Sequence, residues 1–224
     1  TSLATRLPRA VARSSGPTRN PSSPKLRPFF TPLLTVRHGA PRGRFEVARP
    51  ARLPYILAMP TMEEYAKQPA ADRLKRLERT AEELAAAIRG QSEAALARRP
   101  DAKNWAAKEA LCHLRDTEEL FMGRFELIKA MDEPKLPPLS PTTPDRWAED
   151  RQYLKNDAHA ALAAFRRRRE ESLAYLRTLA PEQWTRGAVH PQRGRMTVDD
   201  FVTLMAWHDD NHLDQLKRAL EGQA

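Results

Sequence analysis

Four stretches of the chain repeat apolar residues at the three- and four-residue spacing of a single helix face. The helices predicted from this pattern span about residues 70–90, 106–131, 157–179 and 198–221, and a short helical piece is expected near residues 147–153. The connecting segments are rich in proline or glycine, and none shows the alternating pattern of a strand. The pattern therefore predicts an all-α four-helix bundle with long connections after the second and third helices.

Histidines lie on the inward face of two of these helices. The stripe of the second predicted helix contains His113, and the stripe of the last contains His208 and His212. Residues four apart on a helix have Cβ atoms about 6 Å apart, so two such imidazoles can reach one cation. Core histidines satisfied by hydrogen bonds are the alternative, but two buried rings on adjacent turns leave many nitrogens to satisfy.

Facing helices of a bundle can supply the ligands of one metal ion. Three neutral imidazoles leave a coordination position for water or substrate, as in catalytic metal sites, and they suit zinc, nickel or another divalent ion. We therefore predict His113, His208 and His212 as metal ligands. Asp116, Asp209 and Gln215 are candidates for holding the histidine tautomers.

Two other metal motifs fit the sequence less well. The run H-D-D-N-H resembles the H-E-x-x-H helix of zinc proteases with Asp209 in place of glutamate, but the carboxylate is shorter and any third ligand must lie upstream. A di-iron carboxylate bundle needs two E-x-x-H motifs, and the sequence offers only a half-match in Asp209 and His212.

Charge and proline content divide the chain near residue 61. The full sequence carries a net charge of +9, yet all of this excess lies in the first 60 residues, where Glu46 is the sole acid. We predict a disordered Arg/Pro/Ser-rich extension over residues 1–61 and a folded domain over residues 62–224. The extension has three candidate explanations: a targeting segment, a nucleic-acid-binding tail, or a mis-assigned start upstream of Met59 or Met62.

Composition excludes several classes of protein. The single cysteine, Cys112, rules out an internal disulfide and a cysteine-cluster zinc site and fits a reducing compartment. No apolar run is long enough to cross a membrane, and no glycine-rich phosphate loop is present. Since the predicted domain is close to neutral, we expect no nucleic-acid and no membrane partner.

The sequence resembles the DinB-like superfamily, which includes bacillithiol-transferase-like (YfiT-like) proteins. The resemblance rests on the blocks NWAAKEALCHLRDTEELF, FRRRREESLAYLRTLAPEQW and HPQRGRMTVDDFVTLMAWHDDNHLDQL and on the long proline-rich loop, and it covers about residues 65–221. It implies a four-helix bundle, often a homodimer, with one divalent metal bound by three histidines. His113, His208 and His212 match the ligand positions of the family.

The resemblance also implies a chemistry. Characterised relatives transfer low-molecular-weight thiols to electrophiles or isomerise small molecules with a thiol cofactor. We therefore expect a cytoplasmic metal-dependent thiol S-transferase or hydrolase, in which the metal activates a thiol or water. A non-enzymatic metal-binding or stress-protection protein is the alternative. Arg169 falls where relatives often carry an arginine near the pocket; the alternative is that it lies on a solvated face of its helix. His190 precedes the last helix near a candidate pocket mouth, which makes it a second candidate pocket residue.

Overall fold

The computed structural model describes residues 59–140 and 142–224. The predicted extension over residues 1–61 falls almost entirely outside the described residues, so it and the domain boundary stay predictions. The elements in chain order are α1 Met62–Ala66, α2 Ala70–Ile88, α3 Glu93–Ala97, α4 Ala107–Ala130, α5 Thr143–Asp150, the 3₁₀ turn η1 Tyr153–Lys155, α6 Ala158–Arg177, the 3₁₀ turn η2 Pro181–Thr185, β1 Gly187–His190, β2 Gly194–Thr197 and α7 Val198–Leu220.

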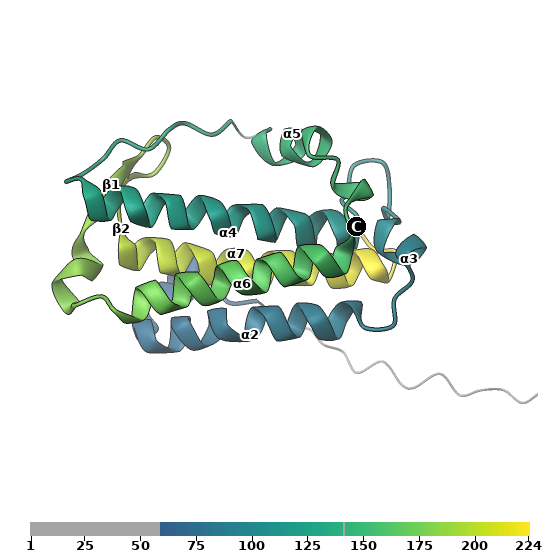
Figure 1. Ribbon diagram of the computed structural model, residues 1–224, viewed down its shortest axis with the longest axis horizontal. Helices are drawn as coiled ribbons and strands as arrows, with labels where there is room; N and C mark the ends of the chain where they lie inside the picture. Colours follow the sequence, from purple (N-terminus) through teal and green to yellow (C-terminus); the bar gives the residue numbers. More distant parts are fainter. Residues whose placement is uncertain (1–58, 141) are drawn as a thin grey trace, which may run out of the picture. The chain divides into compact units, whose positions relative to one another are not determined.

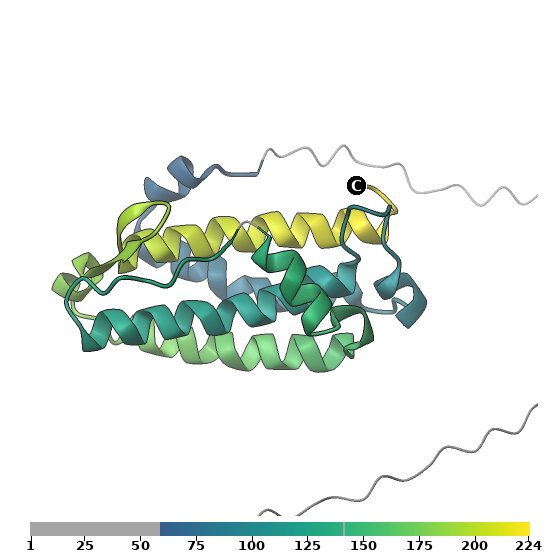
Figure 2. The same cartoon turned by 90° about the horizontal axis from the view of Figure 1, so that it is seen from above.

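The four long helices α2, α4, α6 and α7 form the predicted four-helix bundle (Figure 1). Helix α4 packs against α6 and α7, and α2 packs against the same two helices from the other side. Helices α4 and α6 run in the same direction, because the long connection that contains α5 carries the chain back along the bundle (Figures 1 and 2). The four helices therefore do not follow a simple up-and-down order.

Local chemistry explains where the long helices begin and end. Thr197 caps α7, since its side chain accepts the N–H of Asp200 at 3.1 Å while the Asp200 carboxylate accepts the N–H of Thr197 at 2.8 Å. Just beyond the end of α2, Gly90 has a φ of 72°, a left-handed conformation that costs glycine little and other residues more. Both boundaries lie within two residues of the predicted ones.

The connection between α6 and α7, where we expected no strand, contains two short strands. Strands β1 and β2 form an antiparallel hairpin in which Ala188 pairs with Met196. The proline-rich segment after α4 joins this hairpin, because Val189 donates its N–H to the Pro134 carbonyl at 2.9 Å. The expectation of no strands was therefore wrong. The sequence pattern missed these strands because four residues are too few to show a clear alternation of apolar and polar positions.

The core lies along the inner faces of the bundle. Phe125, Phe165, Phe201 and Leu77, each from a different long helix, are fully buried. Apolar burial of this kind is the dominant stabilising contribution to a domain of this size. The predicted inward stripes of α4 and α7 therefore do face the bundle interior, and this places their histidines between the two helices.

Candidate metal centre

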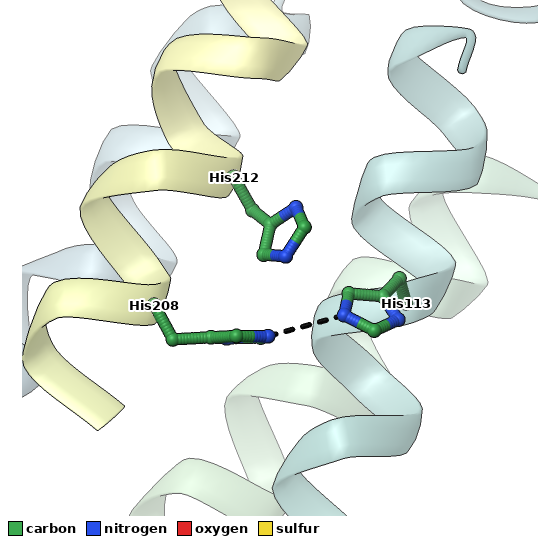
Figure 3. A group of neighbouring side chains, drawn as sticks. All are labelled: His113, His208 and His212. Atoms are coloured by element: carbon green, nitrogen blue, oxygen red, sulfur yellow. Dashed lines mark hydrogen bonds between the residues drawn. The ribbon is translucent and has the colours of Figure 1, made fainter. Parts of the chain in front are cut away.

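The three predicted histidines meet in the gap between α4 and α7 (Figure 3). One ring nitrogen from each lies within 4.8 Å of a nitrogen of the other two. The Nε2 atoms of His113 and His208 are 3.1 Å apart, and the ring centres of His208 and His212 are 4.3 Å apart. The i, i+4 spacing on α7 provides one pair, and the packing of α4 against α7 brings in the third ring.

The environment keeps all three imidazoles neutral. Burial lowers the pKa of His113 to about 3, and the neighbouring His212 contributes in the same direction. Burial also lowers the pKa of His208 well below its ordinary value, with His212 and His113 adding to the effect, and burial lowers the pKa of His212. Neutral imidazole is the form that binds a metal ion, so no proton has to be removed near neutral pH.

Hydrogen bonding fixes one of the three tautomers. His212 Nδ1 lies 2.8 Å from Gln215 Oε1. An amide oxygen can only accept, so Nδ1 carries the proton and the Nε2 lone pair of His212 is free. His113 Nδ1, by contrast, is buried without a hydrogen-bond partner within residues 59–140 and 142–224. Of the three candidates for this orienting role, Gln215 fits and the carboxylates of Asp116 and Asp209 bind arginines instead.

This donor set fits a divalent metal ion. Zn–N bonds of about 2.0–2.1 Å in a tetrahedral site place neighbouring ligand nitrogens about 3.3 Å apart. The 3.1 Å between the Nε2 atoms of His113 and His208 is close to that value. Without a metal, the same pair can share one N–H···N hydrogen bond, so the geometry suits either state.

A cavity of about 340 Å³ opens beside the histidines. Its walls are mainly apolar and include Trp105, Leu120, Phe121, Leu139, Trp147 and Leu204. The proline-rich segment and the start of α5 lie over α4 and α7 and cover this side of the bundle (Figure 2). A small organic molecule therefore has room next to the three imidazoles.

Trp105 is a site residue that the sequence analysis did not single out. Its ring lies nearly parallel to that of His212, with centres 6.2 Å apart, and 5.1 Å from the ring centre of His113. Its Nε1–H donates to Asp145 Oδ1 at 3.0 Å, which links the start of α4 to α5. A tryptophan just before a helix does not by itself indicate a site, because its contact with His212 depends on how α7 packs against α4.

Comparison with known proteins agrees with this arrangement. The family model described as "DinB superfamily" matches residues 76–216, which include all four bundle helices in whole or in large part. The chain belongs to the DinB superfamily. The three histidines of this DinB bundle lie within the matched region.

Three curated relatives are similar to this DinB chain at low identity. "Putative metal-dependent hydrolase YfiT" of Bacillus subtilis is 26% identical over 110 residues, which are 49% of this chain and 60% of the relative. Two proteins of Oceanobacillus iheyensis carry the same functional description. OB0413 is 23% identical, and the match covers 67% of this chain and 85% of that protein. OB0782 is 27% identical, and the match covers 49% of this chain and 61% of that protein. The match thus spans about three-fifths of the length of YfiT.

A solved structure supports the fold. The structure of Bacillus subtilis YfiT, titled a probable metal-dependent hydrolase with an unusual four-helix bundle topology, superposes with a TM-score of 0.63 at 22% identity. It covers 70% of this chain and 90% of YfiT. At that identity the similarity establishes the four-helix bundle and nothing finer.

Two other residues singled out in the sequence do not line the cavity of this DinB bundle. Arg169 is buried rather than solvated, and its guanidinium donates to Asp209 and Glu118 on the neighbouring helices. His190 lies half-buried on β1, where its Nδ1 accepts the backbone N–H of Gln192 at 3.3 Å. Arg169 is thus held by carboxylates on the two helices that carry the histidines, and His190 is not part of the three-histidine cluster.

Cys112 and His159 are not part of the three-histidine cluster. Cys112 is fully buried, and burial raises the pKa of its thiol to about 11, so it suits packing rather than nucleophilic attack. His159 is exposed near the start of α6. In the described part of the chain, no helix has the length and apolar character needed to cross a membrane.

Proposed function

We propose that this DinB protein is a metal-dependent enzyme that hydrolyses a small organic substrate. His113, His208 and His212 would hold a divalent ion, with zinc or nickel as the expected metals. The observation that carries the proposal is the convergence of three neutral imidazoles, two of them with Nε2 atoms 3.1 Å apart, beside an apolar cavity. The functional names of the curated relatives point to the same class of reaction.

The bound metal would supply Lewis acidity, which lowers the pKa of a bound water and polarises a substrate carbonyl or phosphoryl group. The residues of this chain do the rest. Gln215 holds the His212 ring with Nε2 facing the other two imidazoles. Trp105 packs against His113 and His212 and limits their rotation. The apolar walls exclude bulk water and hold the hydrocarbon part of the substrate.

A low-molecular-weight thiol would take the place of water if the enzyme is an S-transferase. In that case the thiol would release its proton to solvent, and the thiolate would displace a leaving group from an electrophile held in the same cavity. A homodimeric state and a cytoplasmic location are further predictions. Size-exclusion chromatography with light scattering tests the first, and fractionation of the source cells tests the second.

Metal analysis provides the first test. The full chain, purified without added chelator, is expected to retain close to one divalent ion per chain. His113→Ala, His208→Ala and His212→Ala should each reduce that content, and the exposed His159→Ala serves as the matched control. A wild-type protein that binds no divalent ion, or a triple variant that binds as much as wild type, would overturn the proposal.

Activity provides the second test. A panel of aryl esters, amides and phosphoesters should be hydrolysed by the metal-loaded protein and not by the chelator-treated protein. A parallel assay with a small thiol and an electrophilic dye separates thiol transfer from hydrolysis. Metal binding with neither activity would favour the non-enzymatic metal-binding alternative.

A further inference from the structure

A buried arginine lies in the same cavity as the histidines. Arg124 is on α4, eleven residues after His113, a spacing that places both on one face of the helix. Only 7% of its surface is exposed, and it lines the cavity together with His113 and His208. It also borders a second cavity of about 350 Å³ under the proline-rich segment.

The guanidinium of Arg124 has no partner in the described part of the chain. No carboxylate among these residues lies within the 4.0 Å of a salt bridge, and no hydrogen bond from its N–H groups is present. It contacts aromatic rings instead, with its Cζ 5.6 Å from the ring centre of Phe121 and 5.5 Å from that of Phe201. Such contacts use the face of the guanidinium and leave its edge donors free.

The other buried arginines of the bundle are all paired within the described residues. Arg73 binds Asp199, Arg76 binds Asp210, and Arg169 binds Asp209 and Glu118. Accordingly, attraction to acidic partners outweighs burial and raises the pKa of Arg76 and Arg169. Burial alone acts on Arg124 and lowers its pKa. The guanidinium nitrogens of Arg124 are not fully buried, so an anion that enters the cavity can reach them and supply the partner that the described residues do not.

The cavity keeps the guanidinium within reach of the histidines. The Phe121 ring centre is 6.2 Å from the His208 ring centre and 5.6 Å from Arg124 Cζ. The distance from Arg124 Cζ to the His208 ring centre is therefore at most the sum of these two distances. Among the described residues that line this cavity, Arg124 is the only lysine, arginine, aspartate or glutamate.

We infer that Arg124 binds the anionic group of the substrate, a carboxylate or phosphate, while the apolar walls hold its hydrocarbon part. Both anions accept two N–H groups from the edge of a guanidinium, which gives charge-assisted and oriented bonds. The reactive group of such a molecule would then lie toward the three histidines, a part of the inference that rests on the proposed function. The substrate class is a small organic acid or phosphate monoester with an aryl or alkyl body.

Isothermal titration calorimetry with matched probes tests this inference. The anionic probes are 4-phenylbutyrate and phenyl phosphate, and the neutral probe is 4-phenylbutanamide, which has the shape of the first without its charge. Titrations use the full chain both as purified and after metal removal, since a carboxylate could otherwise bind the metal itself. In the metal-free protein we expect at least one anion to bind about tenfold or more tightly than the amide.

Variants assign the preference to Arg124. Arg124→Met should abolish the preference for the anion, Arg124→Lys should retain part of it, and Arg167→Met on the exposed face of α6 should leave it unchanged. Circular dichroism and thermal unfolding confirm that each variant is folded, and Arg124→Gln provides a second neutral replacement. Equal binding of anions and amide, no saturable binding of either anion, or an unchanged preference in Arg124→Met would overturn the inference.

The outcome is separable from that of the proposed function. Metal-free protein and the His113→Ala/His208→Ala/His212→Ala variant should both keep the preference for the anion, because Arg124 does not depend on the metal. If the protein retains no metal but keeps this preference, the proposed function fails and the anion site stands. If metal-dependent hydrolysis is found without any preference for anions, the proposed function stands and the anion site at Arg124 fails.

Discussion

The Arg169 guanidinium on α6 donates to both carboxylate oxygens of Asp209, at 2.5 and 3.1 Å, and Asp209 directly follows His208 on α7. The same guanidinium donates to Glu118 on α4 at 2.7 Å. One buried cation thus joins the two helices that carry the histidines to a third helix. This arrangement fixes the rotation of α7 about its axis, and that rotation determines where His208 and His212 point.

Removing this cation should destabilise the bundle strongly. Arg169→Met leaves Asp209 and Glu118 buried without their shared partner, and breaking a buried ion pair in this way costs about 3–5 kcal/mol. Chemical denaturation measures the free energy of unfolding. Arg167→Met, two residues away and exposed, should change it by less than about 0.5 kcal/mol. Equal losses in the two variants would show that the buried pair has no special role.

Acid should weaken the contact between α4 and the segment around η1. The Asp116 carboxylate accepts hydrogen bonds from Arg115, Arg151 and Tyr153. Burial alone would raise the pKa of Asp116, but these bonds outweigh it and lower the pKa to about 2 from an ordinary 3.8. The folded state therefore binds this proton less readily than the unfolded state, and stability present above pH 3.8 is lost as the pH falls toward 2.

The loss assigned to Asp116 should be no more than about 2–3 kcal/mol. Denaturation curves at a series of pH values measure it, with Asp116→Asn as the variant. Since an amide does not titrate, this variant should be less stable near neutral pH and less sensitive to acid between the two pKa values. The exposed Asp132→Asn serves as control. An unchanged acid dependence in Asp116→Asn would contradict the assignment.

The bond between His212 and Gln215 should contribute to metal affinity. Gln215→Met removes the acceptor at Nδ1 and frees the ring to rotate or change tautomer, which typically lowers metal affinity about 10–100-fold. Gln215→Glu keeps an acceptor and should retain affinity close to that of wild type. Competition with a chromophoric chelator measures these differences. The exposed Gln223→Met is the matched control, and a wild-type affinity in Gln215→Met would show that the bond is dispensable.

The hairpin should be sensitive to a methyl group at one glycine. A Cβ at Gly187 would lie 2.5 Å from the Met196 carbonyl oxygen, so the paired strand would have to move. We expect Gly187→Ala to cost about 1–3 kcal/mol of stability. Gly123 on α4 is exposed and has no atom within 4 Å of such a Cβ, so Gly123→Ala should be neutral or stabilise by up to about 1 kcal/mol. Thermal unfolding distinguishes the two outcomes, and a Gly187→Ala protein as stable as wild type would contradict the close approach.

The sequence alone determined the helices and the residues of the candidate centre. Helix boundaries depend on apolar spacing and on nearby caps such as Thr197, both of which are local. The spacing of His208 and His212, and the position of His113 on an inward stripe, follow from helical periodicity in the same way. Because these signals arise within about one or two turns of helix, they can be read without knowing how the helices pack.

Only the tertiary structure decided which side chains meet across the bundle. Arg169 sits in a run of four arginines, and nothing in that run distinguishes it from Arg167, yet one is buried between carboxylates and the other is exposed. Arg124 lies eleven residues after His113 on the same face of α4, but its lack of a partner among the described residues depends on what the neighbouring helices and the proline-rich segment place around it. Pairing of this kind joins residues 40 or more positions apart, as in Arg169 with Asp209. The packing of whole helices sets such contacts, and that packing is a property of the folded chain rather than of any local pattern.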